Sequence, residues 1–166
     1  MTTQKVLLPY NYTHLDQKAL DFVIHTFGGT QDVAVTVFNA YTPITEIETD
    51  ATSVTGRLKS SLHYLLQKIK ENEKALDVVK NKLIEGGLAE NQVNCVFRPR
   101  KKDIASEIVD LVKSDKFDTI VLNRKHARVI GIGDVAIMEN LSSDIINIEH
   151  GFRNLILHRA INIWFL

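Results

Sequence analysis

The side chains that could bind or transform a ligand stand in two short segments, each directly after an apolar run. Asn11 and Thr13 follow the run 6–9, and a basic cluster at 124–128 follows the run 119–122. Amides, hydroxyls and cations of this kind hold anions through charge-assisted hydrogen bonds. The predicted ligand-binding residues are therefore Pro9, Asn11, Thr13, Asn123, Arg124, Lys125, Arg128 and Ser142.

A third segment with basic side chains, 98–102, follows the apolar run 93–97. It would leave the same edge of a sheet as the cluster at 124–128, so the two could hold an anion jointly. The alternative is a solvated basic rim that acidic helices elsewhere balance, which is the commoner situation for basic loops. Both interpretations stay open at this stage.

Catalytic chemistry has weaker support. An enzyme needs a nucleophile beside a base, or paired carboxylates, at one site. The hydroxyls of Thr13, Ser142 and Ser143 stand near expected helix starts, where helix capping is their ordinary role. No two histidines have the i, i+4 spacing of a zinc site, and Cys95 is the single cysteine. We therefore predict no catalytic residues, no metal site and no internal disulfide, and an enzyme is the less favoured class.

The elements that must position these residues alternate strictly between strand and helix. Short apolar runs predict strands, and apolar residues three and four apart predict helices. Such alternation predicts an α/β fold in which helices cover both faces of a five-stranded parallel sheet, a three-layer α/β/α sandwich. Ligands bind these sheets beyond the carboxyl ends of the strands. The expected strands are 6–8, 33–38, 93–97, 119–122 and 154–158; the expected helices are 13–27, 58–85, 103–112 and 135–149, with a polar surface loop at 41–55.

Length and composition indicate one domain. The 166 residues, 45% of them hydrophobic, can fill one sizeable core, and we place that core at 1–158 with a C-terminal extension at 159–166. Lys and Arg together number 20, as do Asp and Glu, so no net charge attracts nucleic acid or an anionic membrane. The chain begins without a signal sequence and contains no apolar run of about 20 residues. We expect a cytoplasmic protein.

Several segments resemble the universal stress proteins over almost the whole chain. They are VLLPYNYT at 6–13, KALD at 18–21, DIASEI at 103–108, FDTIVL at 117–122 and the stretch 142–157. The resemblance implies an adenine nucleotide alpha hydrolase-like sheet in the order 3-2-1-4-5, with the switch point between strands one and four. It also implies a homodimer, and for one subgroup of the family ATP binding.

The residues that would bind ATP depart from the family pattern. ATP-binding members carry a glycine, two residues, a second glycine, nine residues, and then a glycine with a serine or threonine. His126, Val129, Glu139 and Asn140 occupy those positions in this chain. Because a Cβ there would keep the phosphates from the backbone amides, we predict no ATP binding in the family's usual mode. Asn11 also replaces the aspartate of the first strand, which gives up a charge-assisted bond to a ribose.

The leading functional hypothesis is a universal-stress-protein-like stress-response module that acts by binding a protein partner or by sensing a small anion, with no cofactor predicted. The alternative is a member that binds ATP or AMP through a divergent phosphate loop. The apolar C-terminus predicts a homodimer in which strand edges pair, because an apolar edge strand that is exposed to water is unfavourable. A tail that folds back over its own domain is the other interpretation. The predicted interface residues are Leu155, Leu157, Ile161, Ile163, Trp164 and Phe165.

Overall fold

A computed structural model describes residues 3–44, 55–122 and 162–165. Within these residues strands and helices alternate as predicted, up to the fourth strand. The elements are β1 (Gln4–Pro9), α1 (His14–Phe27), β2 (Val33–Tyr41), α2 (Thr55–Glu85), the 3-10 turn η1 (Glu90–Gln92), β3 (Val93–Pro99), α3 (Ile104–Asp115), β4 (Thr119–Leu122) and β5 (Asn162–Phe165). The predicted loop 41–55 is shorter at both ends, because Tyr41 ends β2 and Thr55 begins α2. The predicted helix 135–149 lies outside the described residues.

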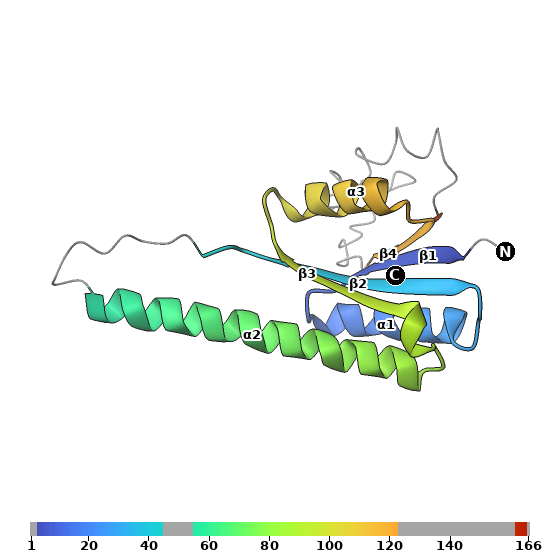
Figure 1. The fold of residues 1–166 in the computed structure, drawn as a ribbon, viewed down its shortest axis with the longest axis horizontal. Coiled ribbons are helices and arrows are strands. Elements are labelled where there is room, and N and C mark those ends of the chain that lie inside the picture. The colour runs from blue at the N-terminus through green and yellow to red at the C-terminus, as the bar shows by residue number, and fades with distance from the viewer. Residues whose placement is uncertain (1–2, 45–54, 123–161, 166) are drawn as a thin grey trace, which may run out of the picture.

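The five strands form one parallel sheet in the order β3-β2-β1-β4-β5, which confirms the predicted order. Helices α1 and α2 lie on one face and α3 lies on the other, so the predicted three layers are present (Figure 1). Successive residues of β1 serve opposite faces. Val6 and Leu8 pack with α1 and α2, whereas Leu7 packs with α3, and all three side chains are fully buried. None of the described helices is long and apolar enough to cross a membrane.

The position of the fifth strand differs from the prediction. The expected strand 154–158 lies outside the described residues, and β5 is instead formed by Asn162–Phe165, which pair in parallel with Thr119–Leu122 of β4. Pairing within its own sheet satisfies backbone groups of this apolar segment, so assigning it to an extension beyond the core was wrong. Ile163, Trp164 and Phe165 thus belong to an edge strand. Leu155, Leu157 and Ile161 lie outside the described residues, and dimerisation stays a prediction.

The ends of α1 and α2 meet at two glycine pairs, Gly28-Gly29 and Gly86-Gly87. Gly29 and Gly87 have φ values of 78° and 102°, a left-handed conformation that commonly ends helices and that glycine adopts without strain. The amide of Gly29 donates to the carbonyl oxygen of Gly87 at 3.0 Å. The two turns therefore contact each other through their backbones, and this contact fixes the end of α2 against α1.

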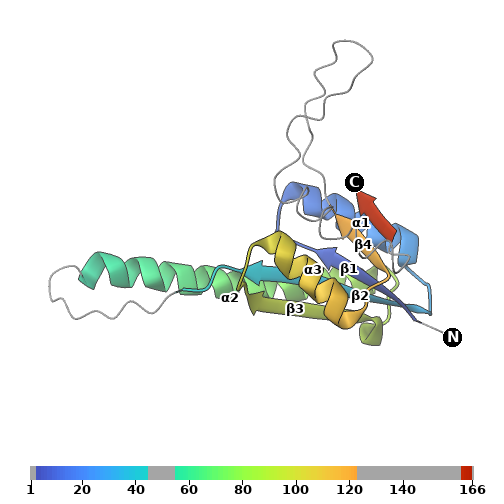
Figure 2. The same ribbon diagram turned by 90° about the horizontal axis from the view of Figure 1, so that it is seen from above.

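Helix α2 is longer than the part of the sheet that it covers (Figure 2). Leu76, Val79 and Leu83, in its second half, are buried in the core. In its first half Leu62 and Leu65 are 39% and 47% exposed, although they continue the same helical stripe. The structure therefore buries the second half of the stripe and leaves the first half beside a cavity.

Candidate functional site

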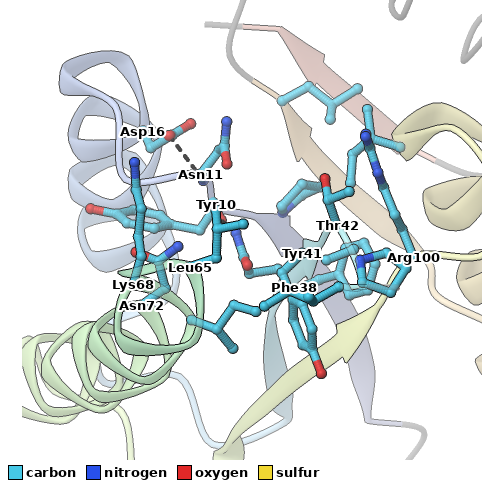
Figure 3. A pocket seen from close by; sticks show the side chains of 18 of the residues that line it. Tyr10, Asn11, Asp16, Phe38, Tyr41, Thr42, Leu65, Lys68, Asn72 and Arg100 are labelled. Atoms are coloured by element: carbon cyan, nitrogen blue, oxygen red, sulfur yellow. Dashed lines mark hydrogen bonds between the residues drawn. The ribbon is translucent and has the colours of Figure 1, made fainter. Parts of the chain in front are cut away.

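A cavity of about 710 Å³ lies at the carboxyl ends of β1, β2 and β4. Its walls come from the end of β1, the end of β2, the first half of α2 and the segment between β3 and α3 (Figure 3). The side chains of Phe38, Ile104 and Leu122 supply apolar surface to it. Because the sheet order reverses between β1 and β4, the cavity lies at the switch point where ligands bind in folds of this class.

The segment after β1 is held by a buried carboxylate. Oδ2 of Asp16 accepts the amide of Asn11 at 3.0 Å, the amide of Thr13 at 2.8 Å and the hydroxyl of Thr13 at 2.7 Å. Together with the bond from the Asp16 amide to the Thr13 hydroxyl, this forms a capping box at the start of α1, which confirms the capping role expected for Thr13. The Thr13 hydroxyl thus has partners within the protein, and Thr13 does not line the cavity.

Pro9 and Asn11 do line the cavity, so the structure brings two of the three predicted β1 residues to one site. The backbone of Asn11 is occupied by Asp16, but its side chain is exposed and lies in the pocket (Figure 3). An exposed amide can donate one hydrogen bond and accept another from the same ligand. Asn11 is therefore a candidate for recognition of a neutral polar group.

Asn39 is a site residue that the sequence reasoning missed. Its side chain is buried, and its Nδ2 donates to the carbonyl oxygen of Tyr10 at 2.7 Å, which ties the end of β2 to the end of β1. No donor among the described residues reaches its Oδ1. Asn39 lines the cavity, so this oxygen is available to a ligand donor. The available signal was an asparagine inside an otherwise apolar strand, which needs a buried partner.

Helix α2 presents one face to the cavity through Leu62, Leu65, Lys68, Ile69 and Asn72. Their spacing of three and four residues places them on the same side of the helix. Lys68 and Asn72 interrupt an apolar stripe, which was the signal that this part of the helix does not pack into the core.

Tyr12 ties this helix to the segment after β1. Its hydroxyl donates to the carbonyl oxygen of Asn72 at 2.5 Å, and its φ of 60° is in the left-handed region. Burial, with smaller contributions from the neighbouring Cys95 and Tyr10, raises the pKa of the Tyr12 hydroxyl, so it stays protonated and keeps donating. The α2 wall and the β1 wall of the cavity are thus joined directly.

The basic residues in the segment 98–102, at the end of β3 and after it, divide into those with acidic partners and those without. Arg98 forms an ion pair with Glu107 at 2.9 Å and stacks on the Phe38 ring, and Lys102 forms one with Asp110 at 2.9 Å. Burial raises the pKa of Glu107, but the amides of Lys101 and Lys102 and the charge of Arg98 outweigh it, so the net pKa is lowered. These cations are therefore neutralised by α3.

Arg100 and Lys68 are different, because no acidic side chain among the described residues pairs with either. Both line the cavity, and Figure 3 shows them on opposite sides of it. The amide of Arg100 donates to the carbonyl oxygen of Tyr41 at 2.8 Å, which holds this residue beside the end of β2. Two cations that share one pocket favour an anionic ligand.

The geometry suits binding more than bond-breaking chemistry. The polar side chains at the cavity are amides, cations, the hydroxyls of Tyr10, Tyr41 and Thr42, and a carboxylate that is bound to backbone amides. The part of the chain that the structure describes holds no cluster of three metal-ligating His, Cys, Asp or Glu side chains. Burial raises the pKa of the Cys95 thiol, so it stays a weak nucleophile. The predicted site residues Asn123, Arg124, Lys125, Arg128 and Ser142, and the four glycine-motif positions, lie outside the described residues.

Comparison with known proteins gives matches to solved structures alone: no family model and no curated protein matches the chain. The universal stress protein UspA from Lactobacillus plantarum is 14% identical, with a TM-score of 0.61, over 100% of this chain and 99% of that one. A universal stress protein from Archaeoglobus fulgidus is 13% identical, with a TM-score of 0.61, over 99% and 94%. The Archaeoglobus fulgidus protein in complex with dAMP is 13% identical, with a TM-score of 0.58, over 99% and 98%.

These matches extend over nearly the full length of both chains, and they agree with the sheet order and the three layers described above. The resemblance seen in the sequence is therefore confirmed at the level of structure: this chain has the fold of the universal stress proteins.

Proposed function

We propose that this chain is a universal-stress-protein-like module that senses a small anion, a phosphate monoester of the nucleoside monophosphate type, in the cavity at the switch point. The observation that carries the proposal is the pair Lys68 and Arg100, which line one cavity without an acidic partner among the described residues. A phosphate monoester carries up to two negative charges at neutral pH, so two cations match it.

The remaining walls support a nucleoside attached to that phosphate. Phe38, Ile104 and Leu122 offer apolar surface on which a base can pack. The amides of Asn11 and Asn39 can hydrogen-bond ring nitrogens or ribose hydroxyls. Two universal stress proteins with related folds were solved with nucleotides that carry a single phosphate: dAMP, at a TM-score of 0.58, and cAMP, at a TM-score of 0.53. Both complexes support a nucleotide with one phosphate for the present chain, and the dAMP complex supports a phosphate monoester, because cAMP is a cyclic diester.

The proposal is consistent with the predicted lack of ATP binding in the family's usual mode. A triphosphate needs a series of backbone amides that approach closely, and the glycines that would permit this are replaced at His126, Val129 and Glu139. A single phosphate can be held by side-chain cations instead. The module would then report the level of a monophosphate without hydrolysing it.

Isothermal titration calorimetry with AMP, ATP and adenosine tests the proposal. We expect AMP to bind more tightly than adenosine, because adenosine lacks the phosphate. Arg100→Gln should weaken AMP binding by about tenfold or more, the value of a charge-assisted hydrogen bond, and leave adenosine binding unchanged. Lys101→Gln is the matched control, because Lys101 is the next residue and does not line the cavity.

Failure of AMP to bind, or an equal loss of AMP affinity in Arg100→Gln and Lys101→Gln, would contradict the proposal. Binding of ATP more tightly than AMP would favour the alternative of a divergent phosphate loop.

A further inference from the structure

The cavity has an apolar extension that a nucleoside monophosphate does not explain. We call it the apolar arm, and define it as Leu62, Leu65 and Ile69 of α2 with Pro43 and Ile44 after β2. Its three α2 residues belong to the first half of the helix, which continues past the end of the sheet (Figures 1 and 2). Every residue of the arm has an apolar side chain, whereas the inner part of the cavity contains the amides and cations.

The arm continues the stripe by which α2 packs into the core. Leu62, Leu65 and Ile69 lie on the same face of the helix as Leu76 and Leu83, which are buried. Leu62 and Leu65 are 39% and 47% exposed, so the described residues leave much of their apolar surface uncovered. An apolar surface that forms one wall of a pocket is a binding surface for apolar groups.

The charges at the inner end of the arm identify what kind of apolar molecule fits. Lys68 follows Leu65 by three residues on the same helix, and Figure 3 shows Leu65, Lys68 and Asn72 beside Tyr10 and Asn11. Arg100 lies across the cavity, next to Tyr41 and Phe38. A purely hydrocarbon ligand would leave both cations without a partner. A ligand with an anionic head and an apolar tail satisfies both ends.

We infer that the cavity also takes an amphipathic phosphate ester whose phosphate lies between Lys68 and Arg100 and whose single hydrocarbon chain lies in the apolar arm. This inference rests on the proposed function, because both ligands use the same two cations, and it adds a second class of phosphate monoester to the first. The cavity volume of about 710 Å³ is within the range of pockets that enclose ligands larger than a simple phosphate.

The test compares ethyl phosphate with octyl phosphate, the latter below its micelle concentration, by calorimetry on the whole chain. Each fully buried methylene group adds about fourfold in affinity. Because the arm is partly open, we expect octyl phosphate to bind at least about tenfold more tightly than ethyl phosphate. Arg100→Gln should weaken both ligands, since both carry the phosphate.

Leu65→Gln and Leu66→Gln form a matched pair. The two leucines are neighbours on α2 with exposures of 47% and 46%, but only Leu65 lines the cavity. Glutamine has nearly the helix propensity of leucine, so both variants should fold. We expect the ratio of the affinities for octyl and ethyl phosphate to fall about fivefold or more in Leu65→Gln and to stay unchanged in Leu66→Gln.

The inference is overturned if octyl phosphate binds no more tightly than ethyl phosphate, or if both glutamine variants lose the advantage equally. If AMP still binds and requires Arg100, the proposed function survives that failure; if AMP also fails to bind, both proposals fall. A third result would overturn the inference too: the protein is a dimer, Leu65→Gln converts it to a monomer, and the affinity does not depend on the length of the alkyl chain. The arm would then bind a second copy of this protein.

Discussion

The contact between the two glycine turns makes a sharp prediction about Gly28, because this residue has no room for a side chain. A Cβ at Gly28 would lie 2.5 Å from the carbonyl oxygen of Ile24 and closer still to that of Gly86, whereas ordinary van der Waals contact begins at 3.4 Å. Both neighbours are backbone atoms of helix ends. Gly28→Ala therefore forces the ends of α1 and α2 apart by roughly 1 Å.

The loss of stability in Gly28→Ala can be compared with that of the same substitution at the next residue, Gly29. Overpacking a tight contact costs about 1–3 kcal/mol, and loss of the bond from the Gly29 amide to the Gly87 carbonyl adds about 1 kcal/mol. We expect Gly28→Ala to lower the free energy of unfolding by about 3 kcal/mol. At Gly29 a Cβ would meet nothing within 4 Å, and only the φ of 78° opposes it. Gly29→Ala should cost about 1 kcal/mol.

Urea denaturation followed by circular dichroism measures both values. The pair is informative because the residues are adjacent and the substitution is the same, so differences in the unfolded state nearly cancel. Two equal losses, or a smaller loss in Gly28→Ala, would refute the close approach of the two helix ends. Either result would also mean that no such contact fixes α2 relative to α1. The position of one wall of the cavity would then lack this explanation.

Two further predictions concern α3 and the sheet edge. Glu107→Gln should lower the free energy of unfolding by about 2 kcal/mol at pH 7, because the carboxylate accepts from two amides and from Arg98. The pKa of Glu107 is lowered in the folded protein, so its contribution to stability is present above the ordinary value of 4.5 and is lost as pH falls below it. The free energies of unfolding of the wild type and Glu107→Gln should therefore converge in acid. A constant difference between them down to pH 3 would contradict this. For the proposed homodimer, in which the outer edge of β5 pairs with a second copy, sedimentation velocity of the intact chain should give a dimer, and a monomer at micromolar concentration would exclude it.

The alternation of strand and helix was sufficient to predict a parallel sheet with helices on both faces, whereas the strand order came from the resemblance to the universal stress proteins. Where the prediction failed, at β5, local pattern had no means to decide. The stretches 154–158 and 162–165 are both apolar and end the same chain, so either fits a buried strand by its residues. Which of them pairs with β4 depends on the connection from β4 and on the register Thr119 to Asn162, and both are properties of the tertiary structure.

The α2 stripe shows a related limit. Periodicity correctly predicted a long helix with one apolar face, but it contains no information about how far the sheet extends beneath that face. The sheet ends while the helix continues, so Leu76 and Leu83 become core and Leu62 and Leu65 become a cavity wall. Lys68 and Asn72 mark the transition in the sequence itself, because a stripe destined for the core would not contain them.

The site residues followed the same division between local and tertiary information. Asn11 was predicted because it directly follows the first strand at the switch point. In the basic segment 98–102, the sequence could not show that Arg98 is neutralised and Arg100 is not, because the neutralising carboxylate, Glu107, comes from the next helix. A charge in a loop therefore becomes a candidate for ligand binding only after its protein partners are known. By that criterion Arg100 and Lys68, at opposite sides of one cavity, are the positions at which charge reversal should most affect an anionic ligand.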